Sequence, residues 1–131
     1  MERSEEVLVL EVGETLIGLP AHEVVAVVRA AAVTPLPAGP SGVDGVVDVH
    51  GTIVPVVEAR ARLGLGHAPL TPGDVFVLVR VGAGRAAIRV DGVRGLEGVR
   101  GVVPAGARRF GRAGDALVVL TPAEALAGDV L

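Results

Sequence analysis

The stretch "GVVDVHGTIVPVVEARARLGLG", Gly45–Gly66, carries the clearest structural pattern of the chain. Two runs rich in β-branched residues, 45–49 and 52–57, flank the dipeptide His50-Gly51. Val and Ile favour extended backbone, and a two-residue connection that ends in Gly is typical of a tight hairpin turn. The stretch therefore predicts a β-hairpin with His50 and Gly51 at its tip.

Short helices are expected beside the strands, and no long ones. Residues 58–65 have helical spacing of apolar positions for at most two turns. The closing stretch 114–128 echoes 51–64, because in each a strand runs into a short helix, in the closing stretch over 122–127. Pro55 has no backbone N–H to donate, which favours an edge position or a bulge in its strand.

The composition favours an all-β fold with many turns. Half of the residues are apolar and only 2 are aromatic, both Phe, so Val, Leu, Ile and Ala must form the core. The 19 Gly and 9 Pro separate Val-rich runs, as in a protein of short strands. The formal net charge of −3 gives no strong field for nucleic acid, and the absence of Cys excludes disulfides.

The pattern restarts after a connection over 64–74. Residues 75–93 repeat the order of features in 7–24, which is an apolar run, a turn with Gly and a second apolar run. Copies of about 65 residues are too small for a generous core alone, so we expect two small β-barrels packed on each other. The expected division is a single domain, 1–131, with subdomains over about 6–65 and 74–128.

Aliphatic side chains at alternate strand positions should form the core, because successive side chains of a strand point to opposite faces. The expected core residues are Leu8, Leu10, Ile17, Leu19, Ile53, Val77, Val79, Ile88, Val90, Leu117 and Val119. Exchange of Ile53 or Ile88 for Ala should then cost about 2–5 kcal/mol of stability.

Little in the chain predicts catalysis or metal binding, and no cofactor is expected. The 3 His lie outside any metal-ligand spacing, and no Cys can complete a zinc site. Asp48 and His50 share a face if both lie on a strand, so a small hydrolase or ligand-binding enzyme built on this pair stays an alternative. No recognisable motif supplies its nucleophile, because Ser4 lies in the N-terminal tail and Ser41 in the Pro/Gly-rich loop 34–42.

Two further motifs have plain structural interpretations. "GAGRAA", 82–87, looks like a phosphate loop, but it joins two predicted strands without a helix and predicts a hairpin turn. Arg108, Arg109 and Arg112 cluster without aromatic residues on which bases would stack. No signal peptide is recognisable, and no apolar run approaches the roughly 20 residues that span a bilayer. By elimination the chain predicts a protein-binding module.

The opening stretch resembles the signature of CheW-like domains, G-V-x-N-x-R-G-x-[IV]-x-P-[IV]-[IV]-D-L-R-x-x-L-G. The similarity continues in family order over nearly the whole chain. It includes "VGETLIGLPAHEVVAVVR" (12–29), "LPAGPSGVDGVVDV" (36–49), "AAIRVDGVRGLEGV" (86–99) and "GDALVVLTPAEALAG" (114–128).

The resemblance implies two SH3-like barrels around a shared apolar core, in a non-enzymatic adaptor of a bacterial chemosensory array. Such a protein links the cytoplasmic tips of chemoreceptors to the regulatory domain of a CheA-type histidine kinase, or to other CheW-like proteins. It would act in the cytoplasm, without nucleic acid or direct membrane contact. The residues expected to contact partners are Val24, Ala26, Val27, Asp48, Val49, His50 and Gly51.

Three departures from the family pattern refine this expectation. The hairpin Arg is His50, and the Glu of the family's V-x-E segment falls at Ala26. Arg is always charged whereas His titrates, so these two changes predict a weakened ionic contact and a larger share for apolar packing. Residues 101–114 are too few for the family's long loop and strand, so the second barrel is expected to be incomplete. An accessory paralogue with poor kinase binding is one version of this hypothesis.

Overall fold

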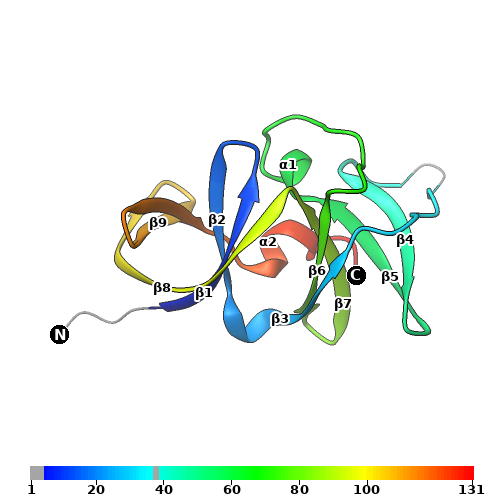
Figure 1. The fold of residues 1–131 in the computed structure, drawn as a ribbon, viewed down its shortest axis with the longest axis horizontal. Helices are drawn as coiled ribbons and strands as arrows, with labels where there is room; N and C mark the ends of the chain where they lie inside the picture. Colours follow the sequence, from blue (N-terminus) through cyan, green and yellow to red (C-terminus); the bar gives the residue numbers. More distant parts are fainter. Residues whose placement is uncertain (1–4, 37–38) are drawn as a thin grey trace.

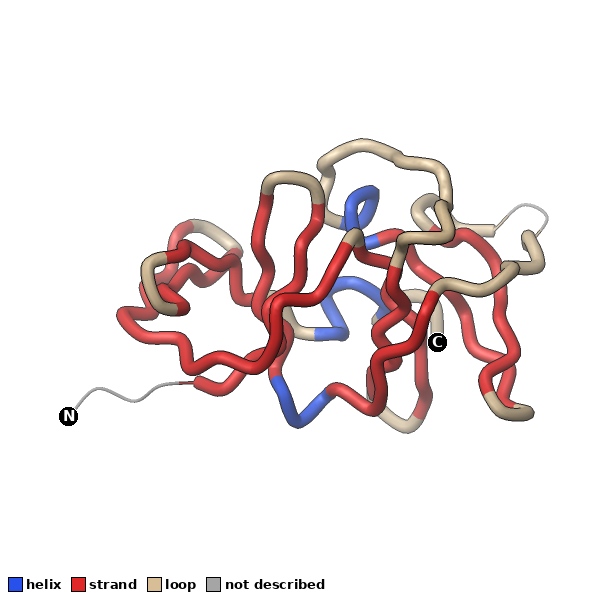
Figure 2. The backbone as a smooth tube through the Cα atoms, in the orientation of Figure 1, coloured by secondary structure: helices blue, strands red, loops and turns tan. Residues whose placement is uncertain are grey.

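The computed structural model describes residues 5–36 and 39–131, so Ser4 and part of the loop 34–42 lie outside the described residues. Strands dominate the described chain, and its helices are short (Figures 1 and 2). The elements are β1 (Glu5–Val12), β2 (Thr15–Pro20), η1 (Ala21–Glu23), β3 (Val24–Arg29), β4 (Val43–Val49), β5 (Thr52–Glu58), α1 (Ala59–Arg62), β6 (Val75–Val81), β7 (Gly84–Val90), β8 (Gly92–Ala105), β9 (Arg108–Ala113), β10 (Ala116–Leu120) and α2 (Ala123–Ala127).

The described strands form two lobes that pack side by side (Figure 1). The closed lobe is a barrel with the strand order β1-β2-β10-β9-β8, and the open lobe is a 5-stranded sheet with the order β3-β6-β7-β5-β4. Each lobe contains a parallel pair, β2 with β10 and β5 with β7, among antiparallel neighbours. The predicted all-β fold of two packed lobes with short helices is confirmed.

The lobes do not follow the two sequential halves, 6–65 and 74–128, that the repeat predicted. Strands β1 and β2 from the first half pair with β8 and β10 from the second half. Strands β3 to β7 form the open lobe by themselves, so the connection 64–74 lies within that lobe and not between lobes. Pairing between distant strands therefore overrides the linear division.

The sequence repeat nevertheless has a structural counterpart. The two lobes have equivalent strands, but the chain visits them in a circularly permuted order. The order β8-β1-β2-β10-β9 corresponds strand by strand to β3-β6-β7-β5-β4, with the parallel pair at the same position. Hairpin β1–β2 thus corresponds to β6–β7, and β10 with α2 corresponds to β5 with α1. These correspondences match the similarities in the sequence. The open lobe is built in chain order from β3 to β7, whereas the closed lobe begins with the equivalents of β6 and β7 (β1 and β2) and ends with those of β3 to β5 (β8 to β10).

The expectation that the second barrel is incomplete is wrong. Strand β8 runs for 14 residues and joins β9 through a two-residue turn at Gly106-Ala107. The pairs Val103↔Phe110 and Ala105↔Arg108 continue the ladder up to that turn. A tight hairpin needs fewer residues than a long loop. The segment 101–114 is therefore long enough for both strands, because a two-residue turn joins them in place of a long loop.

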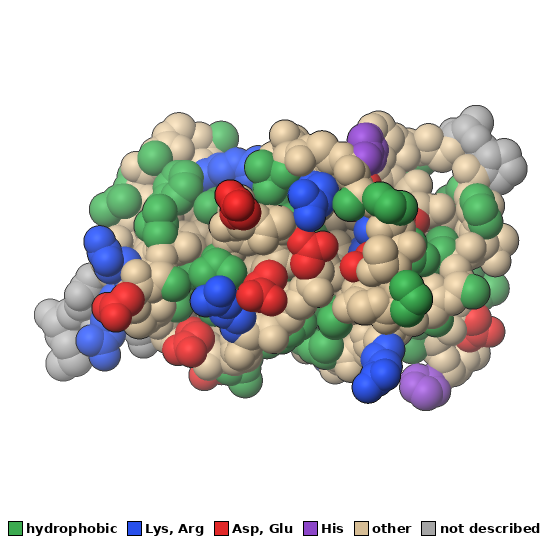
Figure 3. All heavy atoms as spheres, turned by 45° about the horizontal axis from the view of Figure 1, so that its top comes forward, with side chains coloured by type: hydrophobic (Ala, Val, Ile, Leu, Met, Phe, Trp, Pro, Cys, Tyr) green, Lys and Arg blue, Asp and Glu red, His purple; other side chains and the backbone are tan. Residues whose placement is uncertain are grey.

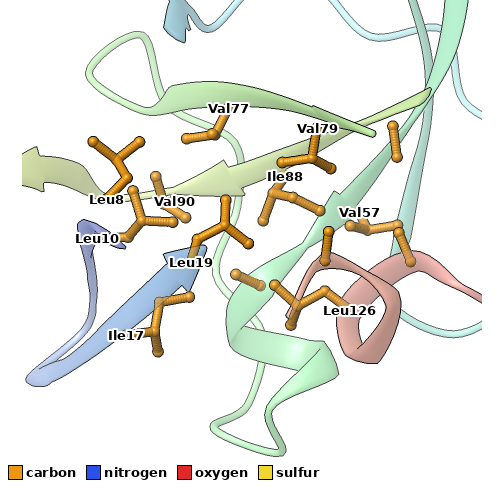
Figure 4. Packing of buried hydrophobic residues seen from close by; sticks show 14 of the residues in the cluster. Leu8, Leu10, Ile17, Leu19, Val57, Val77, Val79, Ile88, Val90 and Leu126 are labelled. Carbon is orange, nitrogen blue, oxygen red and sulfur yellow. The ribbon is translucent and has the colours of Figure 1, made fainter. Parts of the chain in front are cut away.

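A shared core between the lobes explains why several strands are apolar on both faces (Figure 4). On β1, Leu8 and Leu10 point into the shared core, while Val7 and Val9 fill the closed barrel. Such strands read as continuous apolar runs because neither face meets water. Eight predicted core residues lie in this cluster, each at most 6% exposed: Leu8, Leu10, Ile17, Leu19, Val77, Val79, Ile88 and Val90.

Two predicted core positions are wrong. Ile53 is 70% exposed and Leu117 is 63% exposed. By strand alternation Ile53 shares the face of buried Val57, and Leu117 shares that of Val119, which is partly buried against the shared core. The strands extend beyond the core at these two positions. The predicted side of each strand is therefore right, but the prediction that these side chains are buried is wrong.

A buried ionic network that the sequence did not predict fastens the connection 64–74 to the open lobe. The Arg89 side chain is 5% exposed and donates to Asp44 at 2.6 Å and to Asp74 at 3.1 Å. Its Nη2 lies 3.3 Å from a Glu58 oxygen and donates to the Ala68 carbonyl at 2.8 Å. Burial lowers the pKa of Arg89, but its carboxylate partners raise it more, so its pKa lies above the ordinary value.

Candidate functional site

A groove in the open lobe separates β3 from the tip of the β4–β5 hairpin. We call it the β3–hairpin groove, and its volume is about 260 Å³. The two walls come from segments far apart in the sequence, and β6 and β7 supply the floor. The lining residues are Val25, Ala26, Val28, Val49, His50, Thr52, Val54, Leu78 and Arg85.

The base of this groove is firmly packed. Val28 and Val49 are partly buried against a cluster that includes Val54 and the fully buried Phe76. Close-packed side chains of this kind hold a fixed shape, since protein interiors resemble organic crystals in density. The groove therefore has a preformed and largely apolar surface.

The hairpin tip owes its shape to a turn of positive φ. His50 has φ 53° and Gly51 has φ 86°, the signs required at both centres of a type I′ turn. The Asp48 carboxylate accepts a hydrogen bond from the Gly51 N–H at 2.8 Å. Asp48 therefore stabilises the turn, and His50 lies in the turn and not on the strand.

This geometry gives no support to an enzyme built on Asp48 and His50. The Asp48 carboxylate is engaged by the Gly51 backbone, and no hydrogen bond joins the two side chains within the described residues. Among residues 5–36 and 39–131 no group of three His, Cys, Asp or Glu could hold a metal ion. The described chain also has no helix that is both long and apolar enough to cross a membrane.

Arg85 is a groove residue that the sequence reasoning missed. It is exposed at the start of β7 and lies opposite Arg80 in the β6–β7 ladder. Arg80 donates to the His22 carbonyl at 3.3 Å, whereas Arg85 forms no ion pair with any described residue. Arg80 and Arg85 are symmetric about the predicted turn, so the register of "RVGAGR" already placed them opposite each other.

The structure brings together some of the predicted contact residues and separates others. Ala26, Val49 and His50 line the groove, with Asp48 and Gly51 in the adjoining turn. Val24 instead packs against the shared core, and Val27 is 46% exposed on the face of β3 opposite Ala26 and Val28. The bulge between Val24 and Ala26 shifts the register of β3 and separates these two residues, which alternation alone would put on one face. Val27 lies on the opposite face from Ala26 by ordinary alternation.

Comparison with known proteins assigns the chain to a family. Residues 6–103 match the CheW-like domain family. Protein FrzA of Myxococcus xanthus is 33% identical over 92 residues, which are 70% of this chain and 58% of FrzA. The chemotaxis protein CheW of Treponema pallidum (strain Nichols) is 28% identical over 90 residues, which are 66% of this chain and 53% of that protein. The chain thus matches little more than half the length of these relatives.

The fold agrees with the same assignment. The crystal structure of the scaffolding protein TtCheW from Thermoanaerobacter tengcongensis superposes with a TM-score of 0.80 at 20% identity, and the match covers 89% of this chain and 88% of that one. Because the family match extends over most of the chain, the protein belongs to the CheW-like domain family.

Proposed function

We propose that this chain is a non-enzymatic adaptor of a chemosensory array. It links the cytoplasmic tip of a chemoreceptor to a CheA-type histidine kinase or to another CheW-like protein, and it binds at least one of them through the β3–hairpin groove. The observation that carries the proposal is that the family's signature hairpin forms one wall of an open apolar groove. The proposed partners locate the adaptor at the cytoplasmic side of receptor arrays.

Binding in this groove would combine apolar packing with one permanent charge. Partly buried valines provide the apolar contact area, as in the core of most protein interfaces. The family's hairpin Arg is replaced by His50, but Arg85 presents a guanidinium in the same groove. An acidic side chain of a partner can therefore still form a charge-assisted hydrogen bond. The completeness of the closed barrel and the presence of Arg85 both favour a full coupling protein over an accessory paralogue.

Isothermal titration with a receptor-tip fragment and with the kinase regulatory domain tests this proposal. Arg85→Glu places a negative charge in the groove, and Thr52→Trp fills it from an exposed position. Both variants should weaken binding of the groove partner by tenfold or more, on the scale of a reversed charge or a blocked pocket. The matched controls, Arg112→Glu and Leu117→Trp, make the same changes at exposed positions of the closed lobe and should leave this affinity unchanged.

The outcomes separate the alternatives. Loss of kinase binding alone identifies the groove as the kinase site, and loss of receptor binding alone identifies it as the receptor site. Unchanged affinities for both partners in the groove variants would move the contact surface elsewhere. Absence of binding to either partner by the unmodified protein would reject the adaptor function itself.

A further inference from the structure

A second groove lies between the two lobes, on the side where α1 covers their junction (Figure 1). It consists of two hollows of about 150 Å³ and about 480 Å³, which share the side chains of Leu63 and Arg108. We call it the inter-lobe groove. None of its lining residues belongs to the β3–hairpin groove, so both grooves can be occupied at once.

The smaller hollow suits a single apolar side chain. Its walls include Ile17, Leu65 and Val119, and Arg108 is the one charged residue that lines it within the described part of the chain. Leu65 is 44% exposed, so part of this apolar wall faces solvent in the described structure. A cavity of about 150 Å³ with apolar walls is known to hold one benzene-sized group.

The larger hollow carries positive charge at its rim. Arg62, Arg108 and Arg109 line it, and no acidic side chain of the described residues lines either hollow. Arg62 pairs with Asp129 and Arg109 with Glu5, each at 2.7 Å. Arg108 is exposed at the start of β9 and has no ion pair with a described residue. Figure 3 shows arginine side chains beside both apolar and acidic ones on this face, so the positive charge of the groove is local to its lining.

Arg62, which lines the larger hollow, has two nitrogen atoms without hydrogen-bond partners in the described part of the chain. Its Nε and Nη2 atoms are buried and have no hydrogen-bond acceptor among the described residues. Buried guanidinium donors are normally paired, since an unmet donor costs free energy. Nε lies beside Gly42 and away from open solvent, so the unpaired donors that a docked segment can reach are those of Arg108.

We propose that the inter-lobe groove is a docking site for an acidic peptide segment of a partner protein. One apolar side chain of the segment enters the small hollow, and a neighbouring carboxylate pairs with Arg108. The charge of the rim selects an acidic segment, and the depth of the hollow selects an apolar anchor beside it. Nucleic acid suits the site less well, because none of the described residues that line it has an aromatic ring for stacking.

The test is a displayed library of short peptides drawn from Asp, Glu, Lys, Leu, Val and Ala, selected on the unmodified protein. Enriched peptides should pair an acidic residue with Leu or Val. Fluorescence anisotropy then measures their affinity for Arg108→Glu, which should weaken binding by tenfold or more. Arg112→Glu makes the same change on the same strand outside the groove and should alter the affinity less than about twofold.

Leu65→Ser probes the apolar half of the site and should also weaken the selected peptides. Amide shift changes on adding a peptide should cluster at 62–65, 107–109 and 119–122. Enrichment of Lys-rich peptides, equal losses in Arg108→Glu and Arg112→Glu, or no enrichment would overturn the proposal. So would a dimer of the unmodified protein that Leu65→Ser converts to a monomer, because a second copy would then occupy the groove. These outcomes do not depend on the β3–hairpin groove, whose variants leave this site intact.

Discussion

The two lobes have the same order of strand pairing, yet one is closed and the other is open. Strand β8 has 14 residues and pairs with β1 along its first part and with β9 along its second, which closes the barrel. The corresponding strand β3 has 6 residues and pairs with β6 alone. Among the described residues between β3 and β4, Thr34 pairs with Val46 of β4 in an isolated bridge and no further strand forms.

The difference shows how the length of one strand creates a binding surface. A closed barrel has no free edge, whereas an open sheet leaves backbone groups and apolar side chains unpaired at its edges. In the open lobe this gap lies between β3 and the β4–β5 hairpin, where the β3–hairpin groove is found. On the other side of the open lobe, the Arg89 network joins β4, β5 and β7 to the connection 64–74.

The largest expected effect therefore comes from Arg89. Arg89→Ala should lower the free energy of unfolding by about 3–5 kcal/mol, because it leaves three carboxylates in the open lobe without their buried cation. The control in the closed lobe is Arg109→Ala, whose pair with Glu5 is half exposed and should contribute less than about 1 kcal/mol. Urea unfolding monitored by circular dichroism measures both. Equal losses would mean that the network does not stabilise the open lobe in the way inferred.

Substitutions at Ile88 and Ile53 compare the core of the open lobe with its projecting hairpin. Ile88→Ala should cost about 2–5 kcal/mol, because the side chain is fully buried in the shared core. The same change at Ile53, which is 70% exposed, should stay within about 0.5 kcal/mol. The same unfolding experiment decides, and a large loss at Ile53 would indicate that the hairpin tip is covered in solution.

His50 tests whether the opening in the sheet is a contact surface. His50→Arg restores the family's guanidinium at the hairpin tip and should strengthen partner binding by about 1 kcal/mol, the scale of one charge-assisted bond at a surface. Titration calorimetry with the proposed partners measures the change, and His50→Ala serves as the neutral control. Abolished binding in His50→Arg would show that the imidazole itself is recognised. No change in either variant would remove the tip from the interface.

The smallest expected effect concerns the ion pair between Arg62, at the end of α1, and Asp129, which follows α2. The hydrogen bond from Arg62 lowers the pKa of Asp129. Because the folded pKa lies below the unfolded one, this contribution is present at neutral pH and is lost as the pH falls through the folded pKa. Asp129→Asn should therefore lose slightly less stability than the unmodified protein as the pH falls below the ordinary carboxyl pKa of about 4. Urea unfolding midpoints of both proteins, measured over a series of acidic pH values, test this. A larger loss of stability in Asp129→Asn than in the unmodified protein would contradict the prediction.

Much of the local structure followed from the sequence. Runs of Val and Ile predicted the strands, Gly-containing dipeptides predicted the turns at 50–51 and 82–83, and both short helices lie where the spacing placed them. The family was recognised from the hairpin signature, and three of the seven predicted contact residues line the β3–hairpin groove. These features depend on a few neighbouring residues, whose backbone preferences act over short distances.

The remaining features required the tertiary structure. The runs at β5 and β10 are apolar on both faces, so they do not indicate how far the core reaches, and the exposure of Ile53 and Leu117 could not be derived from them. The structure places Arg85 and His50 in one groove and pairs Arg89 with Asp44, and each of these pairs is separated by more than thirty positions in the sequence.

The sequence by itself determined most of the strands, the hairpin turns at 50–51 and 82–83 and the family that the chain resembles, but not the β8–β9 hairpin around 106–107. The tertiary structure alone decided which strands pair across long distances in the chain, such as β1 with β8 and β5 with β7, because those partners depend on packing across the whole chain. The repeat was therefore visible in the sequence, but its circular permutation into a closed and an open lobe was not.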